Sequence, residues 1–345
     1  MQQRIHEYDI IKCIGIVMVV MGHTKSGDYI SHSVNFVHMA LFFLLAGCTN
    51  RKDDYYTSVY NLKFFFWKRI KSLYIPFLKY SLPIILLHNF FYYQGWYTNC
   101  YSLQGWIEQI SRTILFSIGT TEPLLAQLWF IKVLFITELL YAFLLYVLQR
   151  CHVNKWIIII PLGVLALLVN HEWFPHFFRM NLIVPFRALL IYSIGGEMWR
   201  LVQIRNNITI IIAGGGVILW LFASTLFDET SILGAYGIAG LLIIPFSVCL
   251  FVVLWNFCKY IMKINLIDAI IEYVGRNTLP VYFLHYLAFR VITISYLFIL
   301  GTDTAYSRNH VEDIPWWLYV VLSIAISLAF YEMTCCFKKI IEKRK

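Results

Sequence analysis

The feature that most constrains this chain is a series of long apolar runs that recur along all 345 residues. The composition is 60% hydrophobic and only 14% charged, whereas soluble domains are about a quarter charged. A soluble core of this size cannot hide so much apolar surface, but a bilayer can. A membrane-spanning helix needs about 20 mostly apolar residues. The sequence therefore predicts an all-α polytopic integral membrane protein, a single transmembrane domain over residues 1–345. It has about ten transmembrane helices, near residues 8–24, 34–49, 73–93, 127–148, 155–170, 182–200, 207–227, 235–257, 278–300 and 315–337.

The basic residues predict how these helices are oriented. Ten spans divide the loops into two sets, and the set that includes both termini holds nineteen Lys or Arg, against four in the other. Cytoplasmic loops of membrane proteins carry such an excess of basic residues. We therefore predict that both termini lie in the cytoplasm. The formal net charge of +9 is then explained by topology, and no nucleic-acid partner is expected. The moderately apolar segment 106–118 is expected to lie at the membrane interface.

Several kinds of chemistry have no pattern in the sequence. The eight cysteines include no CxxC pair, so we predict neither a disulfide framework nor a zinc site. The patterns HExxH, GxSxG, GxGxxG and the P-loop are also absent. We therefore expect no metal and no nucleotide hydrolysis.

The first predicted helix carries the most informative ionisable pair, since such groups are costly inside a membrane and mark candidate sites. Lys12 and His23 are eleven residues apart, within about 20° of three full turns, so they share one face. They are separated by about 16 Å along the axis, with Lys12 nearer the cytoplasm. An acyl-coenzyme A, with phosphates at one end and a reactive thioester at the other, fits this spacing. A Lys12 that snorkels beside Asp9 and a His23 bonded to the backbone are alternatives that the sequence leaves open.

Other candidates lie on both sides of the predicted membrane. The basic run Lys68, Arg69 and Lys71 could bind the phosphates beside Lys12, although topology alone also explains a basic run. His38 begins the second span just across a short outer loop from His23, so we expect the two histidines to share one cavity. His285 lies in the ninth span, where a core histidine is its simplest interpretation.

On the outer side, Trp129, Lys132 and Arg187 fall in the first turns of their spans. An aromatic ring beside cations suits a sugar, because the ring stacks on the sugar and the charges hold its polar groups. An interfacial aromatic belt explains Trp129 equally well.

Five segments in order resemble the acyltransferase 3 family of membrane proteins, particularly members similar to fucose 4-O-acetylase. They are YDIIK with VMGHT (8–12 and 20–24), FVHMALFFLLAG (36–47), KRIKSLYIPF (68–77), LWFI (128–131) and LPVYFLH (279–285). Ala40, Ala46 and Ser72 depart from the family's Pro, Ser and second Arg of Arg-x-x-Arg. The soluble SGNH-hydrolase extension of some members is not found in these 345 residues.

The resemblance implies transfer of an acyl group, usually acetyl, from cytoplasmic acyl-CoA to a hydroxyl of a surface-polysaccharide or lipid-linked sugar, in a bacterial inner membrane. We then expect the site residues to have three roles. His23 and His38 are catalytic, Lys12, Lys68, Arg69, Lys71 and His285 hold the coenzyme, and Trp129, Lys132 and Arg187 hold the acceptor. The expected partners are acyl-CoA, the glycan acceptor and membrane lipid, and a homo-oligomer is left open. Two rival functions remain: a transporter or flippase of glycan intermediates, and a non-catalytic subunit of a polysaccharide synthase.

Overall fold

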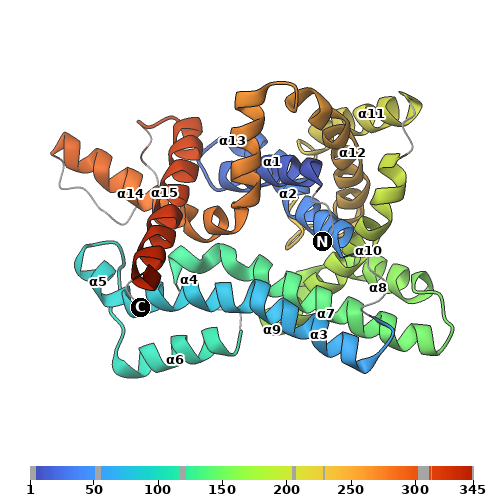
Figure 1. The fold of residues 1–345 in the computed structure, drawn as a ribbon, viewed down its shortest axis with the longest axis horizontal. Coiled ribbons are helices and arrows are strands. Elements are labelled where there is room, and N and C mark those ends of the chain that lie inside the picture. Colours follow the sequence, from blue (N-terminus) through green and yellow to red (C-terminus); the bar gives the residue numbers. More distant parts are fainter. Residues whose placement is uncertain are drawn as a thin grey trace.

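A computed structural model describes residues 5–50, 56–116, 122–203, 207–227, 230–301, 311 and 313–343. Every regular element in these ranges is a helix, and they contain no strand, which confirms the all-α prediction (Figure 1). Some of the basic residues used to predict the orientation lie outside the described residues, namely Arg4, Arg51, Lys52, Arg205, Arg308, Arg344 and Lys345.

Six helical stretches of the described chain are long and apolar enough to cross a membrane, which confirms the polytopic membrane class. They are Asp28–Thr49, Pro123–Arg150, His176–Val202, Gly237–Ile261, Thr278–Leu300 and Trp316–Phe337. Two shorter apolar helices, Trp156–Leu168 and Asn207–Ala223, match two further predicted spans. The total of about ten spans and the cytoplasmic position of both termini remain predictions.

Each predicted span coincides with at least one helix, but the boundaries differ in places. The helices of ten or more residues are α1 (His6–Gly22), α2 (Asp28–Thr49), α3 (Val59–Arg69), α4 (Ile75–Leu86), α6 (Leu103–Ile114), α7 (Trp129–Arg150), α8 (Trp156–Leu168), α10 (Val184–Gln203), α11 (Asn207–Ala223), α12 (Gly237–Ile261), α13 (Asn265–Arg276), α14 (Thr278–Leu300) and α15 (Trp316–Lys343). The short α-helices are α5 (His88–Tyr93) and α9 (His176–Phe178).

The predicted span 73–93 is the one that departs most from a single helix. It begins in a π-helix, η2 (Ile70–Tyr74), continues as α4, which contains Pro83, and breaks at Leu87 before α5. Proline lacks a backbone donor and clashes with the carbonyl four residues earlier, which weakens the turn that precedes Pro83. The loop predicted before this span contains the additional helix α3, and the loop before the ninth span contains α13.

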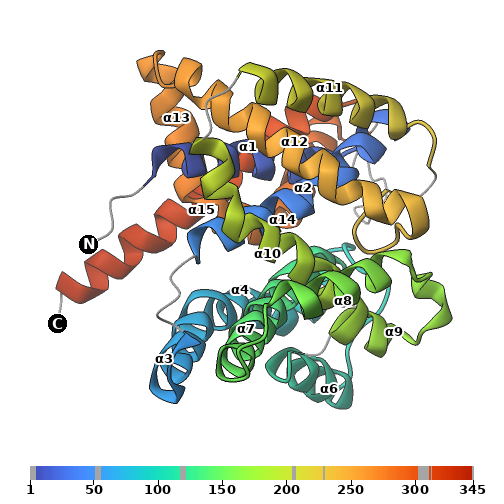
Figure 2. The same cartoon turned by 90° about the vertical axis from the view of Figure 1, so that its right-hand side faces the viewer.

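Helix α10 lies between two groups of helices in both views of the fold (Figures 1 and 2). One group contains α3, α4 and α6–α9, and the other contains α1, α2 and α11–α14. Helix α10 packs against α2 on one side and against α7 and α8 on the other. Small residues allow the closest approach, since a Cβ atom added to Gly47 would lie 2.0 Å from the carbonyl oxygen of Tyr192. Close backbone packing at glycine is typical of membrane helices.

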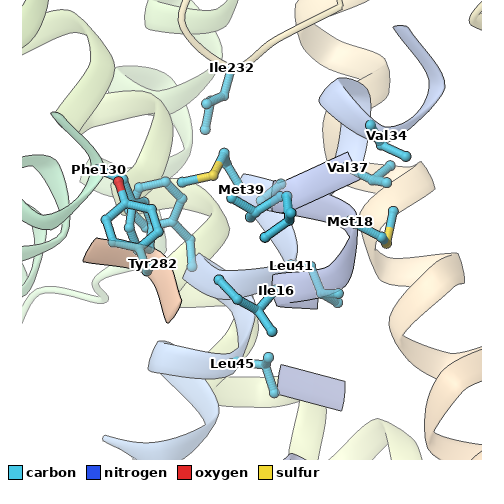
Figure 3. Packing of buried hydrophobic residues seen from close by; sticks show 14 of the residues in the cluster. Ile16, Met18, Val34, Val37, Met39, Leu41, Leu45, Phe130, Ile232 and Tyr282 are labelled. Carbon is cyan, nitrogen blue, oxygen red and sulfur yellow. The ribbon is translucent and has the colours of Figure 1, made fainter. Parts of the chain in front are cut away.

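The main hydrophobic core joins the helices that later form the site. Figure 3 shows Ile16 of α1, Leu41 and Leu45 of α2, Phe130 of α7 and Tyr282 of α14 within one buried cluster. The rings of Phe130 and Tyr282 have centroids 5.8 Å apart at an angle of 65°. This core therefore fixes α1, α2, α7 and α14 relative to one another.

Candidate active site

A cavity of about 300 Å³ lies among α1, α2, α7, α14 and the π-helix η2. Its charged lining residues are Lys12 of α1, Arg69 at the end of α3 and Glu138 of α7. Most of the remaining lining is apolar and includes Phe42 and Tyr282. A π-helix is uncommon and often marks a functional site, and here η2 contributes Ser72 and Leu73 to the cavity wall.

Carboxylates hold the two cations that face this cavity. The Lys12 ammonium lies 3.5 Å from the buried Asp9, and Asp9 also lies 3.9 Å from the Arg276 guanidinium. On the other wall, Arg69 Nε lies 2.9 Å from Glu138, whose other oxygen accepts a 2.8 Å hydrogen bond from Asn50. Asn50 also accepts a hydrogen bond from Arg69. Two fixed positive groups thus share one cavity, which suits a ligand with anionic groups.

The other two basic candidates lie elsewhere. Lys68 and Lys71 are exposed on either side of Arg69, and neither is among the cavity-lining residues. The fold therefore brings Lys12 together with Arg69, while Lys68 and Lys71 stay on the surface of the same segment.

Histidines from two distant parts of the chain meet at the C-terminal end of α1. The ring of His23 stacks on the ring of His285 at a centroid distance of 5.5 Å and an angle of 21°. The hydroxyl of Tyr286 lies 3.2 Å from His23 Nδ1. His285 is fully buried, whereas His23 is partly exposed. The sequence did not indicate that His285, expected with the coenzyme, would contact His23.

His38 lies close enough to His23 for an electrostatic interaction between the two rings. It is buried on α2, and its Nδ1 lies 2.6 Å from the carbonyl oxygen of Val34. A carbonyl oxygen only accepts hydrogen bonds, so Nδ1 carries the proton of this ring. His38 is therefore anchored to the backbone of α2 near the stacked pair of His23 and His285.

Aromatic side chains line the cavity, and one of them contacts a histidine. Tyr282 lines the cavity, and its ring centroid is 6.2 Å from that of His285, one turn further along α14. Phe42 and Phe130, whose rings are 5.9 Å apart, line the cavity beside it. Among the described lining residues there is no histidine. Tyr282 thus connects the cavity lining to the histidine pair.

The three candidates predicted for the outer side differ in what surrounds them. Arg187 is fully buried and donates hydrogen bonds to four carbonyl oxygens, those of Ala166, Val169, Ile232 and Leu233, at 2.8 to 3.2 Å. These bonds tie the end of α8 to the loop before α12, which accounts for a buried arginine without any ligand. Trp129 and Lys132 lie one turn apart on α7, with Lys132 only 5% exposed. The acceptor-binding role of all three remains a prediction.

Sequence reasoning missed a second buried polar pair. His88 Nδ1 lies 2.6 Å from Glu122, and its Nε2 lies 3.0 Å from the carbonyl oxygen of Asn99. The His88 ring stacks on that of Tyr101 at 3.4 Å and 4°. Through these contacts His88 connects Asn99, in the segment after α5, to Glu122, which directly precedes the helical stretch Pro123–Arg150. The sequence signal that could have found it is His88 itself, a histidine inside the predicted span 73–93.

The fold and the site define a polytopic membrane protein with a cavity lined by paired charges and, on the same helix α1, a contact between two histidines. The model of the acyltransferase 3 family, described as an acyltransferase domain, matches residues 5–331. The chain belongs to this family, which makes it a membrane acyltransferase. No curated protein and no solved structure matches the chain.

Proposed function

We propose that this protein transfers an acyl group, most simply acetyl, from cytoplasmic acyl-CoA to a hydroxyl of a surface-polysaccharide or lipid-linked sugar in a bacterial inner membrane. One observation carries the proposal. Helix α1 presents Lys12 to the cavity that Arg69 also lines, and His23 to His285, about 16 Å apart along its axis. A ligand with a polyanionic end and a distant reactive end is the kind that such a helix can hold.

In this proposal the phosphates of the donor lie beside Lys12 and Arg69. Both side chains line the cavity, and their carboxylate partners keep them in position. Exposed Lys68 and Lys71 attract the anionic coenzyme to this entrance. The pantetheine arm then runs past Tyr282 towards His23 and His285. In this proposal His285 meets the thioester end of the coenzyme.

His23 performs the chemistry in one of two ways. Its neutral imidazole takes the proton of the sugar hydroxyl as a general base, or it attacks the thioester and carries the acyl group. His38 orients His23 or the acceptor. Trp129 and Lys132 hold the acceptor from the outer side, where Lys132 supplies a buried cation for an anionic or hydroxyl-rich group, and Arg187 shapes that side through the four carbonyls it binds.

The test is transfer of label from radiolabelled acetyl-CoA to a lipid-linked glycan fraction by the purified protein in liposomes. Loss of a general base typically costs about 10²–10⁴-fold in rate, so His23→Ala should reduce transfer by at least that range while leaving acetyl-CoA binding intact. His152→Gln is the matched control, because His152 is exposed in the loop after α7 and should leave transfer unchanged.

Either of two results would count against the proposal. Equal transfer by His23→Ala and His152→Gln would remove His23 from the mechanism. A well-folded wild type that neither binds acetyl-CoA nor transfers label would favour the transporter or the non-catalytic subunit.

A further inference from the structure

The hydrogen bonds of His285 determine which of its nitrogens carries the proton. Nδ1 lies 2.9 Å from the carbonyl oxygen of Tyr282 and 3.2 Å from that of Val281. Carbonyl oxygens only accept hydrogen bonds, so Nδ1 holds the proton. Nε2 of the neutral ring then carries a lone pair and can accept a hydrogen bond.

That lone pair is unusual. Nε2 of His285 is buried and has no hydrogen-bond partner among the described residues. The great majority of buried polar side-chain atoms do have a partner. An unpaired buried acceptor beside a reactive histidine therefore points to a donor that arrives with the substrate.

The ring contacts of His285 point to the source of this donor. His285 packs against Tyr286 and Phe289 at ring distances of 4.9 and 5.7 Å, and against His23 at 5.5 Å. Of these neighbours His23 is the one proposed to meet the acyl group, and it is partly exposed. A hydroxyl that approaches an acyl group at His23 is thereby brought towards His285.

We infer that His285 is a second catalytic residue, which takes the proton of the acceptor hydroxyl while His23 carries the acyl group. This inference rests on the proposed function and divides its chemistry between two imidazole rings: His23 carries the acyl group and His285 takes the proton. It assigns to His285 a role in proton transfer in place of a role in holding the coenzyme.

The first step forms the acyl-histidine. In this step Nδ1–H of His23 keeps its proton and donates a hydrogen bond to the Tyr286 oxygen, and the lone pair of Nε2 attacks the thioester carbon. A C–N bond forms, the C–S bond breaks, and the sulfur leaves as the CoA thiolate. His23 is then an acyl-imidazolium with one positive charge.

The second step delivers the acyl group. The acceptor oxygen attacks the acyl carbon and gives its proton to His285 Nε2. A C–O bond forms, the C–N bond breaks, and His23 recovers its lone pair. His285 then passes the proton to the CoA thiolate, so that thioester and alcohol become ester and thiol.

The experiment separates the two steps with His285→Asn. The asparagine amide can still donate to the carbonyl of Tyr282 but offers no base at the position of Nε2. Protein in lipid nanodiscs is mixed with radiolabelled acetyl-CoA, first without and then with the lipid-linked glycan fraction. Label on the protein and label on the glycan are counted over time, and acetyl-CoA affinity and thermal unfolding are measured alongside.

We expect the wild type to take up label on the protein and to pass it to the glycan. His285→Asn should take up label at the wild-type rate, with unchanged acetyl-CoA affinity, and discharge it about 10²–10⁴-fold more slowly. His23→Ala should take up none. A purely structural role of His285 would instead reduce uptake, discharge and thermal stability together. If His285→Asn does not fold, His285→Gln is measured in the same way.

Three results overturn the inference. Discharge by the His285 variants within tenfold of wild type removes His285 from catalysis but leaves the acyltransferase intact. If the wild type labels the glycan but its own chain takes up no label in the absence of acceptor, His23 is not the acyl carrier. The acyltransferase activity itself would again stand. A wild type that transfers no label at all refutes the proposed function, and the inference with it.

Discussion

The contact between α2 and α10 should be sensitive to a single methyl group. A Cβ atom at Gly47 would lie 2.0 Å from the carbonyl oxygen of Tyr192, and one at Gly195 would lie 2.2 Å from the carbonyl oxygen of Leu44. Ordinary van der Waals contact begins near 3.4 Å, so Gly47→Ala must separate the two backbones by roughly 1.4 Å. The obstacle is a carbonyl group within a packed helix, which cannot swing aside as a flexible side chain would.

The cost follows from this geometry. Overpacking a well-packed core costs typically about 1–3 kcal/mol, and occasionally more. Because backbone atoms must move here, we expect Gly47→Ala to lower the free energy of unfolding by about 3 kcal/mol. The displacement also weakens the 3.0 Å hydrogen bond from the Cys48 thiol to the Gly195 carbonyl. Since α2 carries His38, acyl transfer should fall as well.

The assay is denaturant unfolding of the purified protein in detergent micelles, followed by circular dichroism. Gly214→Ala is the matched control, because a Cβ atom there has no neighbour within 4 Å. Alanine is favoured over glycine in a helix by about 1 kcal/mol, so the control should be as stable as wild type or slightly more stable. If Gly47→Ala and Gly214→Ala unfold at the same denaturant concentration, the close packing of α2 on α10 is wrong.

Three further predictions concern single side chains. Lys12→Met should weaken acetyl-CoA binding more than Lys71→Met, measured by calorimetry at low salt, because Lys12 lines the cavity and Lys71 is exposed outside it; equal losses would contradict this. Lys132→Met should raise the KM for the glycan acceptor and leave acetyl-CoA affinity unchanged, since its buried side chain lies on the half of α7 that is predicted to face outwards; a change in coenzyme affinity alone would refute the assignment. Burial lowers the pKa of His6, which precedes the predicted span, but its 2.8 Å bond to Asp268 and the nearby carboxylates raise the pKa above 6.5 overall. The docking of α13 on α1 should therefore be tightest below pH 6.5 and loosen as the pH rises through the higher folded-state pKa, as amide exchange in α13 would show; His6→Gln should abolish this dependence.

Periodicity and apolar length predicted the helices well because the bilayer imposes both. The predicted span 278–300 coincides with α14, and 207–227 begins where α11 begins. The same reasoning could not find the break at Leu87, or the helices α3 and α13 in basic segments of mixed polarity. Those features depend on what the segments pack against, and hydropathy does not record packing partners.

The site was predictable only where its residues share one helix. Lys12 and His23 were linked by helical geometry alone, since their spacing fixes both direction and distance. The stacking of His23 on His285 joins residues that are 262 positions apart in the sequence. Nor could sequence distinguish Arg69, which a buried Glu138 directs into the cavity wall, from its exposed neighbours Lys68 and Lys71.

The position of α1 explains why a helix with such costly residues is tolerated. It packs against α2, α12, α13, α14 and α15, so its polar side chains meet protein groups rather than lipid. Asp9 has Lys12 and Arg276, and His23 has Tyr286 and His285. Ionisable groups in a membrane are retained where they face such an interior. A helix enclosed in this way can hold a charged group near one end and a neutral imidazole near the other. An acyl-coenzyme A needs both along one axis, because its phosphates lie far from its thioester.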